Sequence, residues 1–141
     1  MKSGTTKSYT VKKLVAGTSY KFRICAYAKS SNEKICTSKY TNLSVTTLPK
    51  KTAIKKLSAG YGKVKLQWKE VKCSGYQIQY SISKKFSSSV KKADASKKKT
   101  SYTIGKLKKN KKYYIRIRGY VKGNGKKAYG KWSKVKVIKV R

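Results

Sequence analysis

The chain has 141 residues and carries 39 lysines and arginines against three acidic residues, which gives a formal net charge of +36 at pH 7. It contains no histidine, and its carboxylates, Glu33, Glu70 and Asp94, are scattered, so the sequence offers no paired acid and base for catalysis. Three separated cysteines without histidine match no metal-binding spacing. We therefore expect a protein that is not an enzyme and that binds no metal or other cofactor.

The positive charge comes mostly from lysine, because only Arg23, Arg116, Arg118 and Arg141 are arginines. Lysine is a flexible point charge, whereas arginine presents a planar fork of donors. The composition therefore favours diffuse attraction to an anionic partner over specific recognition. Twelve tyrosines, two tryptophans and regularly placed aliphatic residues indicate a packed core despite this charge.

Neither a membrane span nor an export signal is visible in the sequence. No stretch approaches the roughly 18 consecutive apolar residues that a span needs. The first residues, MKSGTTKSYTVKK, lack the apolar core of a secretory signal. We expect either a protein that stays inside the cell or a piece of a longer exported protein.

The first part of the chain contains a repeat of its last part. Residues 8–29 match residues 101–122 at ten of 22 positions without a gap, and the offset of 93 shortens to 92 where SKYTNLSV is matched by GKWSKVKV. A period of about 92 residues suits a whole small β domain rather than a solenoid unit. We expect the last three strands of one domain in residues 1–48 and a complete domain in residues 49–141, joined at Pro49.

Within residues 1–48 the expected core residues are Leu14, Tyr20, Phe22 and Ile24. A hairpin about Ser30 and Ser31 would bring Cys25 opposite Cys36. Two alternatives follow: a cross-strand disulfide, which would indicate an exported protein, or two surface thiols that face each other. Three strands without a partner sheet would leave an apolar face uncovered, so we expect the missing strands to lie upstream of Met1.

The complete copy alternates apolar and polar residues with period two, which is typical of antiparallel strands with one wet face. The turns expected between strands are residues 59–62 and a hairpin centred on Gly123 and Asn124. Residues 83–101 are polar and are expected to be a loop with a short strand. About seven short strands in some 92 residues predict a two-sheet sandwich.

The period-two phase assigns a set of residues to the core of this sandwich. It also turns Val135 and Val137 inward and Lys134 and Lys136 outward on the last strand. The expected core residues are Trp68, Tyr76, Ile78, Tyr80, Leu107, Tyr113, Ile115, Ile117 and Trp132.

Several of these features occur together in one known family. They are Trp68 on the second strand, the GYQIQY third strand, Leu107 six residues before Tyr113, the YYIRIRGY strand and the YGKWS segment. The complete copy resembles a fibronectin type III domain, and it is most similar to the lysine- and tyrosine-rich modules in surface or secreted proteins of Gram-positive anaerobic bacteria. The resemblance implies an all-β, immunoglobulin-like sandwich and a location outside the cell or on its surface.

One role does not depend on the family. A tyrosine at the start of a sandwich strand can fill the core with its ring while its hydroxyl bonds the backbone of the preceding turn, an arrangement called the tyrosine corner. We expect this role for Tyr113 and for Tyr20.

The resemblance implies a non-enzymatic repeat module that acts as a spacer and as an adhesive or glycan-contacting unit beside neighbouring modules. We expect its surface to bind an anionic cell-wall polymer or polysaccharide weakly and by charge alone. The basic residues expected to make this contact are Lys63, Lys65, Arg116, Arg118, Lys134 and Lys136.

The alternative function is that of an intracellular basic protein that binds nucleic acid without sequence specificity and with strong salt dependence. A specific nucleic-acid partner is disfavoured, because most aromatic residues face the core and the remaining Tyr114 and Tyr120 are isolated. Cys73, alone in the loop after Trp68, is expected to be a free thiol.

Overall fold

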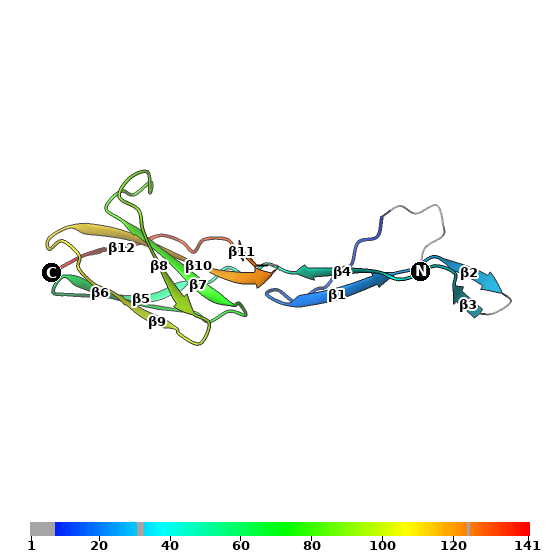
Figure 1. The fold of residues 1–141 in the computed structure, drawn as a ribbon. Helices are drawn as coiled ribbons and strands as arrows, with labels where there is room; N and C mark the ends of the chain where they lie inside the picture. The colour runs from blue at the N-terminus through cyan, green and yellow to red at the C-terminus, as the bar shows by residue number, and fades with distance from the viewer. Residues whose placement is uncertain (1–7, 31–32, 124) are drawn as a thin grey trace.

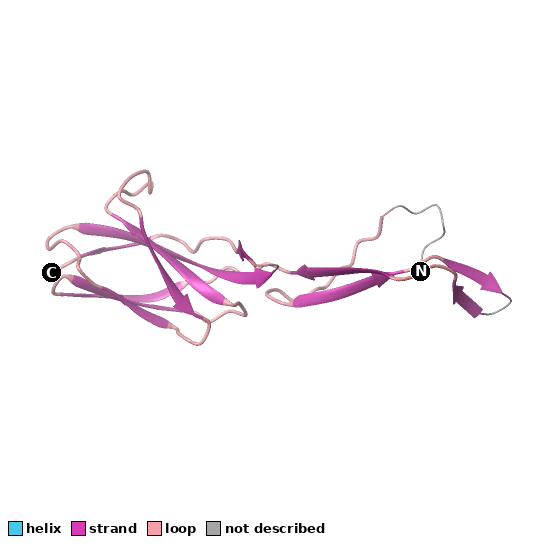
Figure 2. Ribbon diagram, viewed as in Figure 1, coloured by secondary structure: helices cyan, strands magenta, loops and turns pink. Residues whose placement is uncertain are grey.

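The computed structural model of the protein describes residues 8–30, 33–123 and 125–141. Within these residues the chain forms twelve β-strands and no helix (Figure 2). The strands are β1 (Ser19–Ile24), β2 (Tyr27–Ser30), β3 (Glu33–Cys36), β4 (Thr41–Thr46), β5 (Ile54–Gly60), β6 (Lys63–Trp68), β7 (Gly75–Ser81), β8 (Lys91–Ser96), β9 (Ser101–Ile104), β10 (Lys112–Gly123), β11 (Lys126–Tyr129) and β12 (Lys136–Lys139).

Strands β5 to β12 form a sandwich of two antiparallel sheets (Figure 1). One sheet has the order β5-β6-β9. The other has the order β11-β10-β7-β8, and β12 pairs with β10 beside β11. Because β11 and β12 both pair with β10, they act as one interrupted final strand. The all-β sandwich expected from the alternation is therefore confirmed.

The strand register locates the turns between β5 and β6 and between β10 and β11. β5 and β6 pair from Gly60 with Lys63, so Tyr61 and Gly62 form the two-residue turn, and Gly62 has the positive φ of 59° that such turns favour. β10 and β11 form a hairpin in the expected region, but Gly123 pairs with Lys126 and so belongs to β10 rather than to the centre of the turn. Asn124, at the tip of that hairpin, lies outside the described residues, and so do Ser31 and Asn32 between β2 and β3.

The core of the sandwich lies between the two sheets and consists of side chains with one phase on each strand. Each such aliphatic or aromatic side chain contributes about 1.5–3 kcal/mol when it leaves water. The most completely buried are Val64, Leu66, Trp68, Tyr76, Ile78, Ile115, Ile117 and Val140. Leu107 and Tyr113 are also buried in this cluster, and Tyr80 is half-buried against it.

A tyrosine-corner hydrogen bond occurs in both copies of the repeat. The backbone N–H of Lys108 donates to the Tyr113 hydroxyl over 3.1 Å, and the N–H of Val15 donates to the Tyr20 hydroxyl over 2.8 Å. Both bonds span five residues, as expected for the corner. The two copies therefore have the same local geometry at the start of their matching strands.

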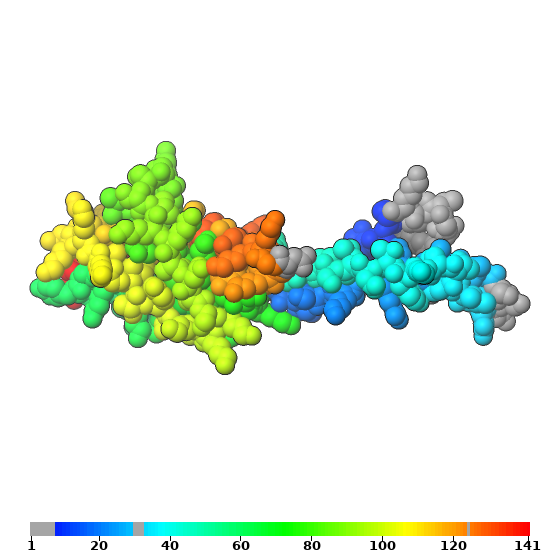
Figure 3. Space-filling model, in the orientation of Figure 1, coloured from blue at the N-terminus to red at the C-terminus, as the bar shows by residue number. Residues whose placement is uncertain are grey.

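Residues 8–48 form two hairpins beyond the sandwich, and Figure 3 shows them as a narrow arm. β1 pairs with β4, and β2 pairs with β3. The expectation that Ile24 lies in a core is wrong, because 70% of its surface is exposed. Leu14, Tyr20 and Phe22 are half-buried, since no second sheet in the part of the chain that the structure describes covers their face.

The expected phase of the last strand is also wrong. Val135 and Val137 are exposed, whereas Ile138 packs against the core and Val140 is buried. Tyr20 pairs with Val45 in the first copy and Tyr113 pairs with Ile138 in the second, so both paired residues are 93 positions apart between the copies. The sequences of the last strands match best with an offset of 92, so the pairing differs by one residue from the sequence match. A shift of one residue turns every side chain of a strand to the other face.

The arm joins the sandwich through close backbone contacts. Pro49 is buried, and its ring is so close to Gly119 that it would crowd a side chain at that position. Its carbonyl oxygen would similarly crowd a side chain at Gly130. Gly17, with a φ of +66°, lies so close to Lys72 that a Cβ would overlap with the Lys72 carbonyl. Glycine is therefore required where the two parts of the chain meet.

Candidate functional site

The outer face of β10 carries alternating guanidinium groups and aromatic rings. The Arg116 guanidinium carbon lies 4.1 Å from the ring centre of Phe86 and 4.4 Å from that of Trp132. The Arg118 carbon lies 4.2 Å from Trp132 and 3.8 Å from Tyr129. We call these five residues the arginine ladder. Each cation–π contact of this kind contributes about 0.5–1 kcal/mol, and more where water is excluded.

The ladder is assembled from four segments of the chain, of which the one that carries Phe86 is distant in sequence from the other three. Arg116 and Arg118 point outward because the residues between and beside them on β10 point into the core. Phe86 comes from the loop between β7 and β8, and Tyr129 ends β11. Trp132 lies in the connection to β12.

The expectation that Trp132 is a core residue is therefore wrong. Its side chain is half-buried on the outer face, and the guanidinium groups of both arginines lie near its ring. The physical reason is that the residues after β11 run irregularly until β12 begins, so the period-two phase does not continue through them.

Two buried glutamines fix the orientation of the guanidinium groups. Arg116 donates from Nε (2.9 Å) and Nη2 (2.7 Å) to Oε1 of Gln79, and Arg118 donates from Nε (3.0 Å) and Nη2 (2.8 Å) to Oε1 of Gln77. Burial lowers the pKa of both guanidinium groups, but arginine remains charged at physiological pH. Because glutamine is neutral, it orients these cations without compensating their charge.

No carboxylate neutralises the ladder within the described residues. The one ion pair there joins the ammonium of Lys127 to Asp94 over 2.6 Å. The Nη1 groups of Arg116 and Arg118 have no hydrogen-bond acceptor among the same residues. The ladder therefore presents two oriented cations that form no ion pair among the described residues and have unused donors, which is the chemistry that binds carboxylate, sulfate or phosphate.

The structure does not bring the six predicted contact residues together. Lys63 and Lys65 are exposed on β6, in the sheet opposite the ladder. Lys134 is exposed before β12. Lys136 lies opposite Ile115, whose side chain faces the core, and its ammonium donates to the Lys55 carbonyl over 3.2 Å. The expected outward direction of Lys136 is therefore wrong, because β12 has the shifted register described above.

The aromatic residues of the outer face are less isolated than the sequence suggested. Tyr120 is buried and packs edge-to-face against Tyr129, with ring centres 5.9 Å apart, and the ammonium of Lys127 lies 4.5 Å from the Tyr120 ring. Sequence reasoning missed Phe86 and Tyr129 as members of the ladder. Two arginines spaced by two on a strand were the available signal, but their ring partners come from loops.

The corresponding strand pair of the first copy has a disulfide in place of a ladder contact. Cys25 and Cys36 are bonded, with Cα atoms 6.0 Å apart, while Cys73 is a free thiol. Cys25 and Cys36 lie 93 positions before Arg118 and Tyr129. Burial raises the pKa of the Cys73 thiol, which reduces its reactivity.

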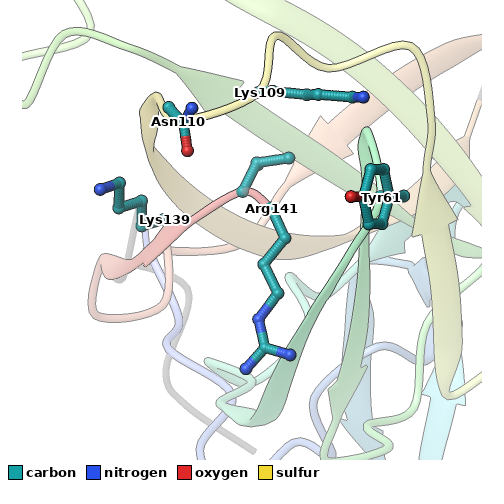
Figure 4. Close-up of a pocket in the computed structure, with 6 residues that line it drawn as sticks. Tyr61, Lys109, Asn110, Lys139 and Arg141 are labelled. Atoms are coloured by element: carbon teal, nitrogen blue, oxygen red, sulfur yellow. The ribbon is translucent and has the colours of Figure 1, made fainter.

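A basic hollow lies beside the C-terminus, at the end of the sandwich distant from the arm (Figure 1), and Figure 4 shows the residues that line it. It has a volume of about 500 Å³ and is lined by Tyr61, Lys109, Asn110, Lys139, Val140 and Arg141. The ammonium of Lys109 lies 4.5 Å from the Tyr61 ring. The hollow is shallow and has no hydrogen-bonded arginine pair, so we regard the ladder as the better candidate.

Other kinds of site are not found in the described residues. No group of three histidine, cysteine, aspartate or glutamate side chains there could hold a metal ion. Over the same part of the chain, no helix is long and apolar enough to cross a membrane.

The fold is similar to solved structures at low sequence identity. The two-domain fibronectin type III segment of chicken tenascin has a TM-score of 0.62 and 20% identity, over 91% of this chain and 68% of that one. The FN5 domain of Drosophila Lar has a TM-score of 0.52 and 20% identity, over 66% and 97%. The FN1–FN3 domains of chicken CNTN1 have a TM-score of 0.58 and 18% identity, over 94% and 46%, so this chain spans under half of that segment.

Sequence comparison leads to the same family. No curated protein matches the chain significantly. A family model described as the fibronectin type III domain matches residues 47–136, which make up most of the sandwich and include the ladder. The chain belongs to the fibronectin type III family.

Proposed function

We propose that the chain is a non-enzymatic repeat module of a bacterial cell-surface or secreted protein, where it acts as a spacer and contacts acidic polymers. The family, the internal repeat and the end-to-end arrangement of arm and sandwich support the spacer role (Figure 1). The bond between Cys25 and Cys36 supports an extracellular location, because disulfides persist in oxidising compartments. The bacterial setting rests on the resemblance to lysine- and tyrosine-rich modules.

The observation that carries the polymer contact is the arginine ladder within a surface of net charge +36. Diffuse lysines attract any polyanion, and this attraction falls steeply as salt rises. The ladder adds two guanidinium groups whose orientation is fixed before a ligand arrives, which lowers the entropy lost on binding. We therefore propose that the ladder is the principal contact and that the surrounding lysines supply long-range attraction.

The ladder favours phosphate, sulfate or carboxylate groups over nucleic-acid bases. Stacking of single-stranded bases needs aromatic faces that are open. The faces of Phe86, Trp132 and Tyr129 are instead approached by guanidinium groups. Nucleic acid should therefore bind through its backbone alone and with no preference for sequence.

The test compares the full chain with two double variants. Arg116→Lys/Arg118→Lys keeps the charge but removes the planar forks, whereas Lys63→Gln/Lys65→Gln removes two charges from the opposite sheet. Binding to heparin, a teichoic-acid-like polymer and mixed-sequence DNA would be measured at about 50 and 200 mM salt. We expect the arginine variant to lose about tenfold in affinity for the preferred polymer at the higher salt, and the lysine variant mainly to show a smaller salt slope.

Three outcomes would contradict the proposal in different ways. If the arginine variant has the affinity of the natural chain while the lysine variant binds more weakly, the chain binds acidic polymers by charge alone and the ladder is not the principal contact. Failure of every polymer to bind at low salt would refute acidic-polymer contact. Persistent binding at the higher salt to DNA alone would instead support the nucleic-acid alternative. Circular dichroism of both variants would check that the sandwich remains folded.

A further inference from the structure

One face of the β1–β4 hairpin is apolar, and no second layer of the described residues covers it. Tyr20 lies opposite Val45, and Phe22 lies opposite Leu43, so these side chains share one face with Ile24. Exposure reaches 70% for Ile24, 61% for Leu43 and 40% for Val45. Apolar side chains gathered on one face of a sheet mark a surface that another element covers.

The complete copy shows what covers the same face there. The residues 93 positions after Tyr20, Phe22 and Ile24 are Tyr113, Ile115 and Ile117. These three are buried in the core between β10 and the other sheet. The residues that bury them lie largely in residues 50–107, among them Trp68, Tyr76 and Ile78. Nothing of this kind covers β1 within the described residues.

The two copies share backbone geometry at the start of their matching strands. Gly17 and Asn110, which are 93 positions apart, both have a positive φ, and their N–H groups donate to the carbonyls of Leu48 and Val140. Arg23 lies 4.7 Å from the Tyr40 ring, as Arg116 lies beside Trp132. The arm therefore already has part of the conformation of the complete domain, although β1 and β2 are separate strands where β10 is continuous.

The edge of β1 shows the same incompleteness. β10 pairs with β12 along one edge and with β7 along the other. Within the described residues β1 pairs with β4 alone, and its second edge offers N–H and C=O groups to another strand. An apolar ligand or a lipid surface would not satisfy this edge, whereas an added strand would.

We propose that the β1–β4 face is the open half of a second sandwich, and that its occupant is a polypeptide with the strand pattern of residues 50–107. A strand like β7 would pair with the open edge of β1. Side chains equivalent to Trp68, Tyr76 and Ile78 would cover Phe22 and Ile24. This proposal is independent of the acidic-polymer contact, because it uses the face of the hairpin opposite Arg23.

The test supplies the occupant on the same chain. Residues 50–99 are placed directly before residue 7, because residue 100 is the repeat equivalent of residue 7, and the rest of the chain to Arg141 is kept. We expect amide exchange at the open edge of β1 to slow at least 100-fold relative to the natural chain. Residues 8–11, which lie 93 positions before β9, should become a strand like β9, and the exposed Tyr9 should become protected.

Matched variants in the extended chain distinguish a covered face from a rigidified arm. Ile24→Ser should abolish the new protection, whereas Lys21→Ser, on the other face of β1, should preserve it. Amide exchange of the original β10 serves as an internal reference for a folded sandwich. If β10 is protected while β1 exchanges as in the natural chain, the proposal is overturned.

Other occupants are tested on the natural chain. Sedimentation that shows a dimer, together with loss of that dimer in Ile24→Lys, would identify a second copy of the chain as the occupant and overturn the proposal. Binding to phosphatidylcholine vesicles that is lost in Ile24→Lys would overturn it in favour of a membrane. We expect the natural chain to be a monomer and not to bind the vesicles.

Discussion

Ile24 and Ile117 form a matched pair for testing how the two copies differ. They are the same residue 93 positions apart on equivalent strands. Ile117 is completely buried between the sheets, whereas 70% of Ile24 is exposed. We predict that Ile117→Ala strongly destabilises the sandwich and that Ile24→Ala leaves its stability almost unchanged.

The magnitude follows from the buried surface. Alanine removes three carbon atoms from isoleucine, worth about 0.8 kcal/mol each when fully buried, or roughly 2.4 kcal/mol in total. The remaining cavity brings the cost at Ile117 into the range of about 2–5 kcal/mol. At Ile24 only 30% of that surface is covered, so the same term is about 0.7 kcal/mol at most. The lower strand propensity of alanine applies to both positions and cancels in the comparison.

The assay is urea unfolding of the full chain, followed by tryptophan fluorescence, to which the buried Trp68 contributes. With a denaturant slope of about 1.5 kcal/mol/M, a loss of about 3 kcal/mol lowers the Ile117→Ala midpoint by about 2 M. Ile117→Val should cost about 0.5–1.5 kcal/mol and so give an intermediate midpoint. Equal midpoints for the two alanine variants would refute the reasoning, since Ile24 would then be as well covered as Ile117.

Three further results are expected. Burial raises the pKa of Tyr76 to about 12, so its stabilising contribution is present below pH 10 and is lost as the pH rises from about 10 to 12, because the unfolded phenol ionises first. The stability advantage of the natural chain over Tyr76→Phe should therefore shrink between about pH 10 and 12. A difference in stability that stays constant over this range would contradict the raised pKa. Gly17→Ala should loosen the joint between arm and sandwich, because its Cβ would overlap with the Lys72 carbonyl. Proteolysis near residue 17 should then be faster than in the natural chain. An unchanged cleavage rate would contradict this prediction. Thiol titration in denaturant should find one reactive group, Cys73, before reduction and three afterwards; three groups before reduction would exclude the disulfide.

The fold could be predicted because its main signal is local. Alternation along residues 63–68 and 113–118 places one face of each strand in the core, and the structure has the same phase there. The prediction failed on β12, where pairing with β10 places Ile138 rather than Val137 opposite the buried Tyr113. Register depends on pairing with β10, and a single strand does not contain that information.

The candidate site was only partly predictable for a related reason. The outward direction of Arg116 and Arg118 follows from the phase of β10. Their ring partners could not be inferred, because Phe86 and Trp132 lie in irregular segments brought to the sheet by tertiary folding. Lys136 was misplaced by the same register shift as its neighbours.

The two copies hold the same strand pair together by different chemistry. In the second copy Arg118 stacks on Tyr129, and in the first copy the equivalent residues are the bonded Cys25 and Cys36. A disulfide restricts the unfolded chain and carries no charge, whereas an arginine stacked on a ring keeps its charge at the surface. The first copy therefore retains one arginine on this face, Arg23, where the second has two. If the ladder is the principal contact with acidic polymers, affinity must then differ between the two copies even though their matching strands share sequence and register.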